Sequence, residues 1–413
     1  MGKSYKWLLI GMLSCAFFFH QADRALFGLL TIPIQKEIGL TDVQIGWINT
    51  TLSWTLAAMT VVAGFLGDRF SRKWIITLSL IAWSLMTICM GFIGGFVGAL
   101  FFRSIATGVG ESFYAPSAYA LIAVHHKETR SVALSIHQAA LYVGLMVSGL
   151  MVAWALGFLG TWRNVFIAFG AAGCALGVFF IWGLKDKSSN PVSPVNPVKN
   201  KTALSAGLRA YFCNPSALCA TAGFVAIVFV NNAYLFWVPK FAAEKFVLDV
   251  GEAGKGVMLW HHLFAFGAIL LGGVITDRFV KRMPRFRLGF QVLALLCGAP
   301  MLAWIGLAPS FAGLLVAVST YGVFRGFFEV NTHASLFDVV PPEHRSTAVG
   351  LLNMIAFFFG GLSGVAMGAL SQKWGVRGFE IGFGVMAAAY AVGALLMAYS
   401  FFFTFRKNRV VEK

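Results

Sequence analysis

Charged residues are scarce in this sequence of 413 residues: Asp, Glu, Lys and Arg make up 12% of it, and hydrophobic residues make up 58%. Soluble proteins carry about 25% charged residues, so this balance excludes a water-soluble domain of this length. The apolar runs extend over roughly 20 residues and lack the alternation that β-barrel strands show. We therefore expect an all-α membrane protein.

Motifs for metal binding and for catalysis are also lacking. The six cysteines stand in or beside apolar runs without CxxC spacing, which predicts neither a disulfide framework nor a metal site. No HExxH, GxSxG or GxxxxGK[ST] sequence occurs, so we expect no enzyme and no cofactor. The net charge of +16 would suggest nucleic acid in a soluble chain, but here we attribute it to membrane orientation and expect no nucleic-acid partner.

Apolar runs of sufficient length predict twelve transmembrane helices. They lie near residues 7–30, 43–66, 74–95, 97–122, 132–158, 163–184, 215–239, 253–275, 287–307, 311–334, 346–370 and 379–405. The Pro- and Ser-rich segment 185–209 separates six helices from six. We expect an N-terminal bundle over 1–184, a cytoplasmic linker over 185–209, and a C-terminal bundle with its tail over 210–413.

A charged loop occurs twice. It follows the second expected helix as GFLGDRFSRK and the eighth as GVITDRFVKR, with the two aspartates 209 residues apart. A second pair, ETRS and EHRS, follows the fourth and tenth helices. These copies indicate an internal duplication. Lys and Arg outside the spans gather in the loops on the side of both termini, so both termini are expected in the cytoplasm.

The duplicated loop, the six-plus-six order and the central linker resemble the major facilitator superfamily of secondary transporters. The resemblance implies two six-helix bundles that expose a central site to either side of the membrane in turn. It also implies that the charged loop serves gating and folding rather than substrate binding. The gating residues expected on this basis are Asp68, Arg69, Arg72, Asp277 and Arg278.

Three stretches narrow the resemblance: HQADR at 20–24, GVGES at 108–112 and WRNVF at 162–166. They are similar both to the anion:cation symporters and to bacterial relatives of the Spinster transporters. In those families the aspartate of helix one and the glutamate of helix four, here Asp23 and Glu111, are candidates for proton coupling. Arginines near them engage an anionic substrate.

Arg103 departs from this family pattern. The family places an arginine seven residues before the glutamate, whereas here Ser104 holds that position and Arg103 precedes Glu111 by eight residues. One residue turns a side chain by about 100° around a helix. The direction of Arg103 is therefore expected to differ from that of the family arginine.

Six charged residues lie inside expected spans, three of each sign: Asp23, Arg24, Arg103, Glu111, Arg325 and Glu329. An ionised group at the bilayer centre costs at least ~2.5–3.5 kcal/mol, so each needs a partner, a cavity or a function. We predict proton coupling at the three acids and substrate binding at the three arginines, with His20 and His333 beside them. The alternatives are static pairs: Asp23–Arg24, Arg325–Glu329, and Glu111 with Arg24 or Arg103.

Neutral polar residues of the central spans are predicted to line the same cavity. They are Tyr114, Gln138, Tyr142, Asn231, Asn232, Tyr234, Trp237, Asn331 and Asn353. Hydroxyls, amides and aromatic faces suit a hydroxylated, sugar-like molecule. For each residue the alternative is a hydrogen bond between helices.

These features together predict a proton-coupled symporter, a monomer in the bacterial inner membrane that imports a small organic anion. A sugar acid such as a hexuronate, an aldonate or a sialic acid is the expected substrate, and sodium is the alternative coupling ion. A Spinster-like carrier of lysolipid or another amphiphile is the competing function. A non-transporting membrane receptor is a remote alternative, since no soluble domain is expected.

Overall fold

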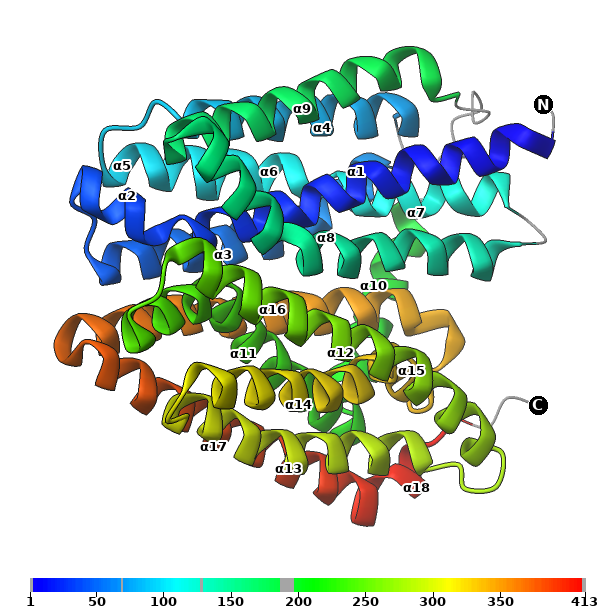
Figure 1. Cartoon of the computed structure of the whole chain (residues 1–413). Coiled ribbons are helices and arrows are strands. Elements are labelled where there is room, and N and C mark those ends of the chain that lie inside the picture. Colours follow the sequence, from blue (N-terminus) through cyan, green and yellow to red (C-terminus); the bar gives the residue numbers. More distant parts are fainter. Residues whose placement is uncertain (1–2, 68–69, 127–128, 186–196, 411–413) are drawn as a thin grey trace. The chain divides into compact units, whose positions relative to one another are not determined.

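The computed structural model describes residues 3–67, 70–126, 129–185 and 197–410. Within these residues all regular secondary structure is helical, with no strand (Figure 1). The all-α prediction is therefore confirmed. Asp68 and Arg69, which the sequence predicts as gating residues, lie outside the described residues.

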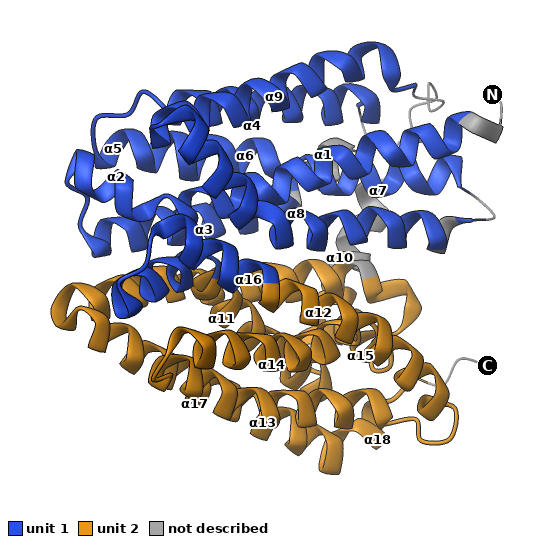
Figure 2. Cartoon of the chain, in the orientation of Figure 1, with its two compact units in different colours: residues 1–194, 235–259 blue, residues 195–234, 260–413 orange. Residues whose placement is uncertain are grey.

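The chain groups into two compact units (Figure 2). Unit 1 comprises residues 1–194 and 235–259, and unit 2 comprises residues 195–234 and 260–413. The helices α11 (Pro215–Phe246) and α12 (Val250–Val280) each contribute to both units. The division into bundles over 1–184 and 210–413, joined by a linker, stays a prediction.

Unit 1 is built around two long helix pairs. Helix α1 packs along α8, and α4 packs along α9 (Figure 1). Its helices are α1 (Lys3–Leu29), α2 (Thr31–Ile38), α3 (Asp42–Gly67), α4 (Arg72–Met90), α5 (Phe96–Ala99), the π-helical η1 (Leu100–Ala106), α6 (Thr107–Ser112), α7 (Tyr114–His125), α8 (Arg130–Leu159) and α9 (Trp162–Gly183).

Unit 2 contains the remaining helices, among which α13 packs against both α14 and α17. Its elements besides its parts of α11 and α12 are α10 (Pro197–Phe212), α13 (Phe286–Leu307), α14 (Phe311–Glu329), α15 (Thr332–Phe337), the 3-10 helix η2 (Pro342–His344), α16 (Arg345–Trp374), α17 (Val376–Tyr399), the π-helical η3 (Ser400–Thr404) and α18 (Phe405–Asn408).

Nine helices among the described residues are long and apolar enough to cross a membrane. The other three expected spans fall on α1, on α3 and on the run from α5 to α7. Polar residues at 20–24 interrupt the apolar run of α1. Each of the twelve expected spans overlaps helical segments of the structure.

The fourth expected span, 97–122, is not one continuous α-helix. The π-helical η1 separates α5 from α6, and α6 ends at Ser112 before α7 begins. A π turn holds an extra residue and re-aims the side chains that follow, and such turns occur frequently at functional sites. This break positions Arg103, which lies in η1, and Glu111, which lies in α6.

The tenth expected span is also divided. Helix α14 ends at Glu329, and α15 begins at Thr332 after a turn over Val330 and Asn331. Arg325 and Glu329 therefore share the last turns of α14. His333 belongs to the next helix, so the three residues do not lie along one continuous helical stripe.

Lys240 joins the end of α11 to the first helices of unit 1. Its Nζ donates to Gln35 Oε1 over 2.7 Å, pairs with the carboxylate of Asp42, and lies 3.5 Å from Glu244 Oε1. The lysine is buried. A buried ammonium needs such partners, because its removal from water is otherwise costly.

Candidate functional site

Asp23 of α1 is held by two side chains from other helices. Arg103 Nη1 lies 3.2 Å from Asp23 Oδ2, and Thr87 Oγ1 of α4 donates to Asp23 Oδ1 over 3.0 Å. Arg103 Nη2 also donates to the backbone carbonyls of Asp23, at 3.2 Å, and of Arg24, at 2.9 Å. Asp23 and Arg103 are both buried. The guanidinium of Arg103 thus bonds both to the side chain of Asp23 and to two backbone carbonyls of α1.

Glu111 of α6 is the second buried acid of unit 1. Its Oε2 lies 3.6 Å from His20 Nε2 and 3.8 Å from Arg24 Nε. Both separations are longer than a hydrogen bond. The two carboxyl oxygens are buried and have no hydrogen-bond partner among the described residues. The Glu111 side chain is 0% exposed, whereas that of Arg24 is 22% exposed.

Arg24 therefore lies beside Glu111, while Asp23 pairs with Arg103. Consecutive residues of a helix point about 100° apart, so two neighbours on α1 meet different helices. The static Asp23–Arg24 pair, which the sequence left open as an alternative, is not the pairing that the structure has. Arg103 reaches α1 despite its eight-residue spacing from Glu111, and it does so from within the π-helical η1.

His20 is oriented by the residues around it. Gln21 Nε2 lies 2.9 Å from His20 Nδ1, and with the amide donating, the proton of the neutral ring stands on Nε2, toward Glu111. The indole of Trp83 lies edge-on to the imidazole at 5.2 Å, and the ring of Phe17 stacks on it at 5.8 Å. These two rings pack against the imidazole of His20 and limit its movement.

Tyr114 connects three helices of unit 1. Its hydroxyl donates to the Leu13 carbonyl of α1 over 2.5 Å and lies 3.1 Å from His137 Nε2 of α8. Gln138, beside His137, is exposed and accepts a hydrogen bond from Tyr119 over 3.0 Å. Tyr142 is buried further along the same helix. Tyr114 and Gln138 thus make hydrogen bonds between helices.

Arg325 is the central charge of unit 2. Its Nη2 lies 3.2 Å from Glu329 Oε2, one turn along α14, and its Nη1 lies 2.9 Å from His261 Nε2 of α12. Arg325 is buried, while the Glu329 side chain is 33% exposed. The Arg325–Glu329 pair expected along the helix is present. The histidine partner was not expected, because a lone histidine on an apolar helix is more often a packing residue.

Aromatic side chains surround this second cluster. The ring of Tyr234 of α11 stacks on His261 at 4.2 Å, and Tyr321 of α14 stacks on it at 5.2 Å. The hydroxyls of Tyr321 and Tyr390 lie 2.8 Å apart. Of these, only Tyr234 was predicted from the sequence. Tyr321 lies four residues before Arg325, a spacing that places both on one face of α14.

The other predicted residues of the C-terminal half are dispersed. Asn331 donates to Thr276 Oγ1 over 3.1 Å, which links the α14–α15 turn to α12. Trp237 is buried in unit 1, where Lys240 Nζ lies 5.7 Å from its ring centroid. Asn232 is buried and His333 is exposed. The remaining predicted residues of this half are the half-buried Asn231 and Asn353 and the exposed Asp277 and Arg278. Arg72, at the start of α4 in unit 1, is half-buried.

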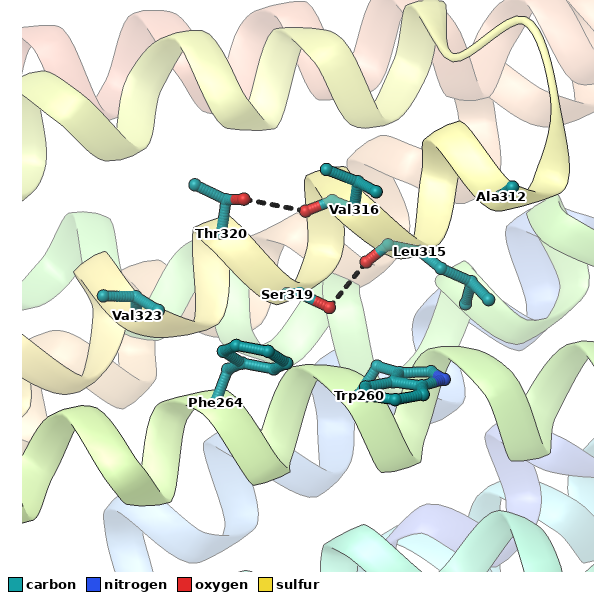
Figure 3. A pocket seen from close by; sticks show the side chains of 8 residues that line it. All are labelled: Trp260, Phe264, Ala312, Leu315, Val316, Ser319, Thr320 and Val323. Carbon is teal, nitrogen blue, oxygen red and sulfur yellow. Dashed lines mark hydrogen bonds between the residues drawn. The ribbon is translucent and has the colours of Figure 1, made fainter.

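A groove of about 480 Å³ lies between α12 and α14 of unit 2, and its walls are apolar (Figure 3). The hydroxyls of Ser319 and Thr320 line it, but they donate back to the Leu315 carbonyl over 2.6 Å and the Val316 carbonyl over 2.9 Å. None of the six charged residues that lie inside expected spans lines this groove. The two hydroxyls are thus engaged by their own helix, and the indole N–H of Trp260 is the other polar side-chain group among the lining residues.

Residues 12–364 match the family model described as Major Facilitator Superfamily. A probable galactarate/D-glucarate transporter of Bacillus subtilis is 23% identical, over 85% of this chain and 82% of that protein. An MFS-type efflux pump of Mycolicibacterium smegmatis is 26% identical, over 90% of this chain and 86% of that protein. A probable sulfoacetate transporter of Cupriavidus necator is 25% identical, over 94% of this chain and 92% of that protein.

The fold also matches a solved structure. A bacterial homolog of the human lysosomal transporter Spinster, in an inward-facing and unoccupied conformation, superimposes with a TM-score of 0.87 at 19% identity, over the full length of both chains. At this identity the likeness concerns the fold alone. The expected likeness to sugar-acid carriers and to Spinster-like proteins is confirmed by these matches.

Proposed function

Because the chain belongs to the major facilitator superfamily and is a multi-pass membrane transporter, we propose that it imports a small organic anion together with protons. Two relatives carry the names of transporters for galactarate or D-glucarate and for sulfoacetate, which are small carboxylate or sulfonate anions. Anion recognition by this chain would use arginine, whose planar fork matches a carboxylate or sulfonate.

The observation that carries this proposal is the state of Glu111. A carboxyl group that is fully buried and has no hydrogen-bond partner among the described residues is costly in its charged form. Its nearest cation is Arg24, at 3.8 Å. The stability of the Glu111 charge therefore depends on the position of Arg24.

Arg24 is the most exposed of the four charged residues in this cluster. An anionic substrate that binds its guanidinium draws positive charge away from Glu111. The carboxylate then takes a proton, and loss of the substrate reverses the exchange. The sequence predicted proton coupling at both Asp23 and Glu111, but Arg103 and Thr87 hold both oxygens of Asp23. We therefore assign the exchange to Glu111.

Uptake into proteoliposomes under an imposed pH gradient tests this function. We expect the wild-type protein to accumulate D-glucarate, sulfoacetate or D-galacturonate only when the outside is more acidic. A sodium gradient without a pH gradient tests the other coupling ion, preloaded vesicles test export, and labelled lysophosphatidylcholine tests the amphiphile-carrier alternative.

The variant Glu111→Gln separates coupling from binding. We expect it to lose accumulation driven by the pH gradient and to retain exchange of external for internal anion, because the amide cannot release a proton. Glu252→Gln is the matched control, since Glu252 is an exposed glutamate at the start of α12. Unchanged gradient-driven accumulation in Glu111→Gln would refute the coupling role.

A further inference from the structure

His261 is fully buried in unit 2, and its two hydrogen-bond partners determine which ring nitrogen carries the proton. Its Nδ1 lies 3.1 Å from the Val318 carbonyl oxygen, which can only accept a hydrogen bond. The ring proton therefore stands on Nδ1. The other nitrogen, Nε2, then presents a lone pair to Arg325 Nη1, 2.9 Å away, and accepts a hydrogen bond from it.

The imidazole has little freedom to turn. It is 0% exposed, and the rings of Tyr234 and Tyr321 stack on it at 4.2 Å and 5.2 Å. The backbone supports the same contact, because α12 and α14 approach closely here. A Cβ atom on Gly322 would collide with the His261 carbonyl oxygen. Both the plane of the ring and its distance from α14 are thus set by packing.

A neutral acceptor affects Arg325 differently from a carboxylate. His261 accepts a hydrogen bond from one N–H of the guanidinium and fixes the plane of that group, but the imidazole adds no negative charge. Glu329 pairs with Nη2 through Oε2, which is buried, while its side chain as a whole is 33% exposed, so its charge is only partly removed from water. Arg325 is thus held in one orientation by His261 while its positive charge is only partly neutralised by Glu329.

We propose that His261 is a positioning residue for anion binding: its locked neutral imidazole orients the Arg325 guanidinium toward the carboxylate or sulfonate of the substrate. The inference rests on the function proposed above. It adds the residue that prepares the binding arginine in unit 2. Arg325 is the group that contacts the anion, and His261 acts through it.

The affinity of purified protein for D-glucarate and sulfoacetate, measured by isothermal titration calorimetry, tests this role without relying on proton coupling. His261→Phe keeps an aromatic ring beside Tyr234 and Tyr321 but removes both ring nitrogens. We expect its Kd to rise roughly 10-fold, the scale of one hydrogen bond to a charged group. His261→Gln restores an acceptor for Arg325, and we expect its Kd to stay within about 3-fold of wild type.

His262→Phe is the matched control, because it changes a buried histidine on the same turn of α12 and is expected to leave Kd unchanged. In a double-mutant cycle, His261→Phe should add little to the loss caused by Arg325→Lys. A wild-type Kd in folded His261→Phe, or additive losses in the cycle, would overturn the inference alone. Failure of the wild-type protein to bind any small organic anion would overturn the proposed function as well.

The KM and kcat for uptake give a second measurement, in which a purely structural role of His261 would not change KM selectively. We expect His261→Phe to raise KM for uptake and to leave kcat near the wild-type value, and His261→Gln to restore KM. A fall in kcat with unchanged KM would contradict the assignment. If His261→Phe does not fold, His261→Gln and His261→Asn carry the test, since only glutamine extends far enough to reach Arg325. Equal KM values for these two variants would then overturn the inference.

Discussion

The two units hold their buried charges in different ways. In unit 1, two acids and two arginines gather around α1, and one acid, Glu111, has no hydrogen-bond partner among the described residues. In unit 2, a single arginine is bonded by a neutral histidine and paired with one partly exposed glutamate. On the function proposed above, the unit 1 arrangement suits exchange of a proton, and the unit 2 arrangement suits a fixed cation.

The two units also differ in the free-energy cost of losing one partner of a charged pair. The Asp23–Arg103 pair is buried at both ends, so neither partner can be solvated if the other is lost. Arg325 instead shares its charge with a group that reaches solvent. Replacing Arg103 in unit 1 and Arg325 in unit 2 by the same residue therefore tests whether each arginine mainly stabilises the fold or mainly binds the anion.

The largest effect is expected at Arg103. Arg103→Met leaves the Asp23 carboxylate buried without its cation and should lower the free energy of unfolding by about 3–5 kcal/mol. The thermal unfolding temperature of purified protein measures this loss. Arg325→Met should lower it less, because Glu329 can be hydrated. Equal losses in the two variants would remove the energetic difference between the units.

A smaller effect is expected when residue 325 keeps its positive charge but the planar guanidinium is replaced by an ammonium. Arg325→Lys should raise KM for anion uptake roughly 10-fold, since an ammonium cannot make two parallel hydrogen bonds. The unfolding temperature should stay near that of the wild type. Full uptake affinity in this variant would show that Arg325 does not clamp the substrate.

Thr87 tests the hydrogen bonds that keep Asp23 in place. Thr87→Val removes the donor to Asp23 Oδ1 and should cost about 1–3 kcal/mol, the range for leaving a buried polar group unsatisfied. Thr87→Ser keeps the hydroxyl and serves as the control. Both unfolding temperatures can be measured together, and an equal stability of the two variants would argue against this bond.

The smallest effect is expected outside the spans, at the exposed Glu37. Hydrogen bonds from Arg163 and Trp162 hold the pKa of Glu37 below its usual value. A carboxyl group with a lowered folded-state pKa stabilises the fold above its unfolded pKa, about 4.3, and this contribution is lost as pH falls through the lower folded value. The unfolding temperature of Glu37→Gln should approach that of the wild type below that pH. A constant difference between pH 3 and pH 7 would contradict this linkage.

Much of this arrangement could be read from the sequence. The hydropathy runs predicted the helices, and charges inside those runs stand out because the membrane makes each of them costly. Asp23, Arg24, Arg103, Glu111, Arg325 and Glu329 were found in this way. The paired sequences DRFSRK and DRFVKR indicated the duplication, and the family match supports the transporter class.

The partners of these charges could not be read from the sequence. Spacing along α1 suggested an Asp23–Arg24 pair, but the choice of partner depends on which helix faces each residue. The π-helical segment η1, which contains Arg103, has no simple sequence signature. His261 was missed for a similar reason, because its role depends on the Val318 carbonyl and Arg325, both of which come from a helix about 60 residues away.

The most direct test of the central claim measures proton movement with the anion. A pH-sensitive dye is enclosed in proteoliposomes with no pH gradient, and D-glucarate or sulfoacetate is added outside. We predict that the lumen acidifies with the wild-type protein, and that it does not with Glu111→Gln even where that variant still exchanges anion. Equal acidification by Glu111→Gln and the wild type would contradict the account.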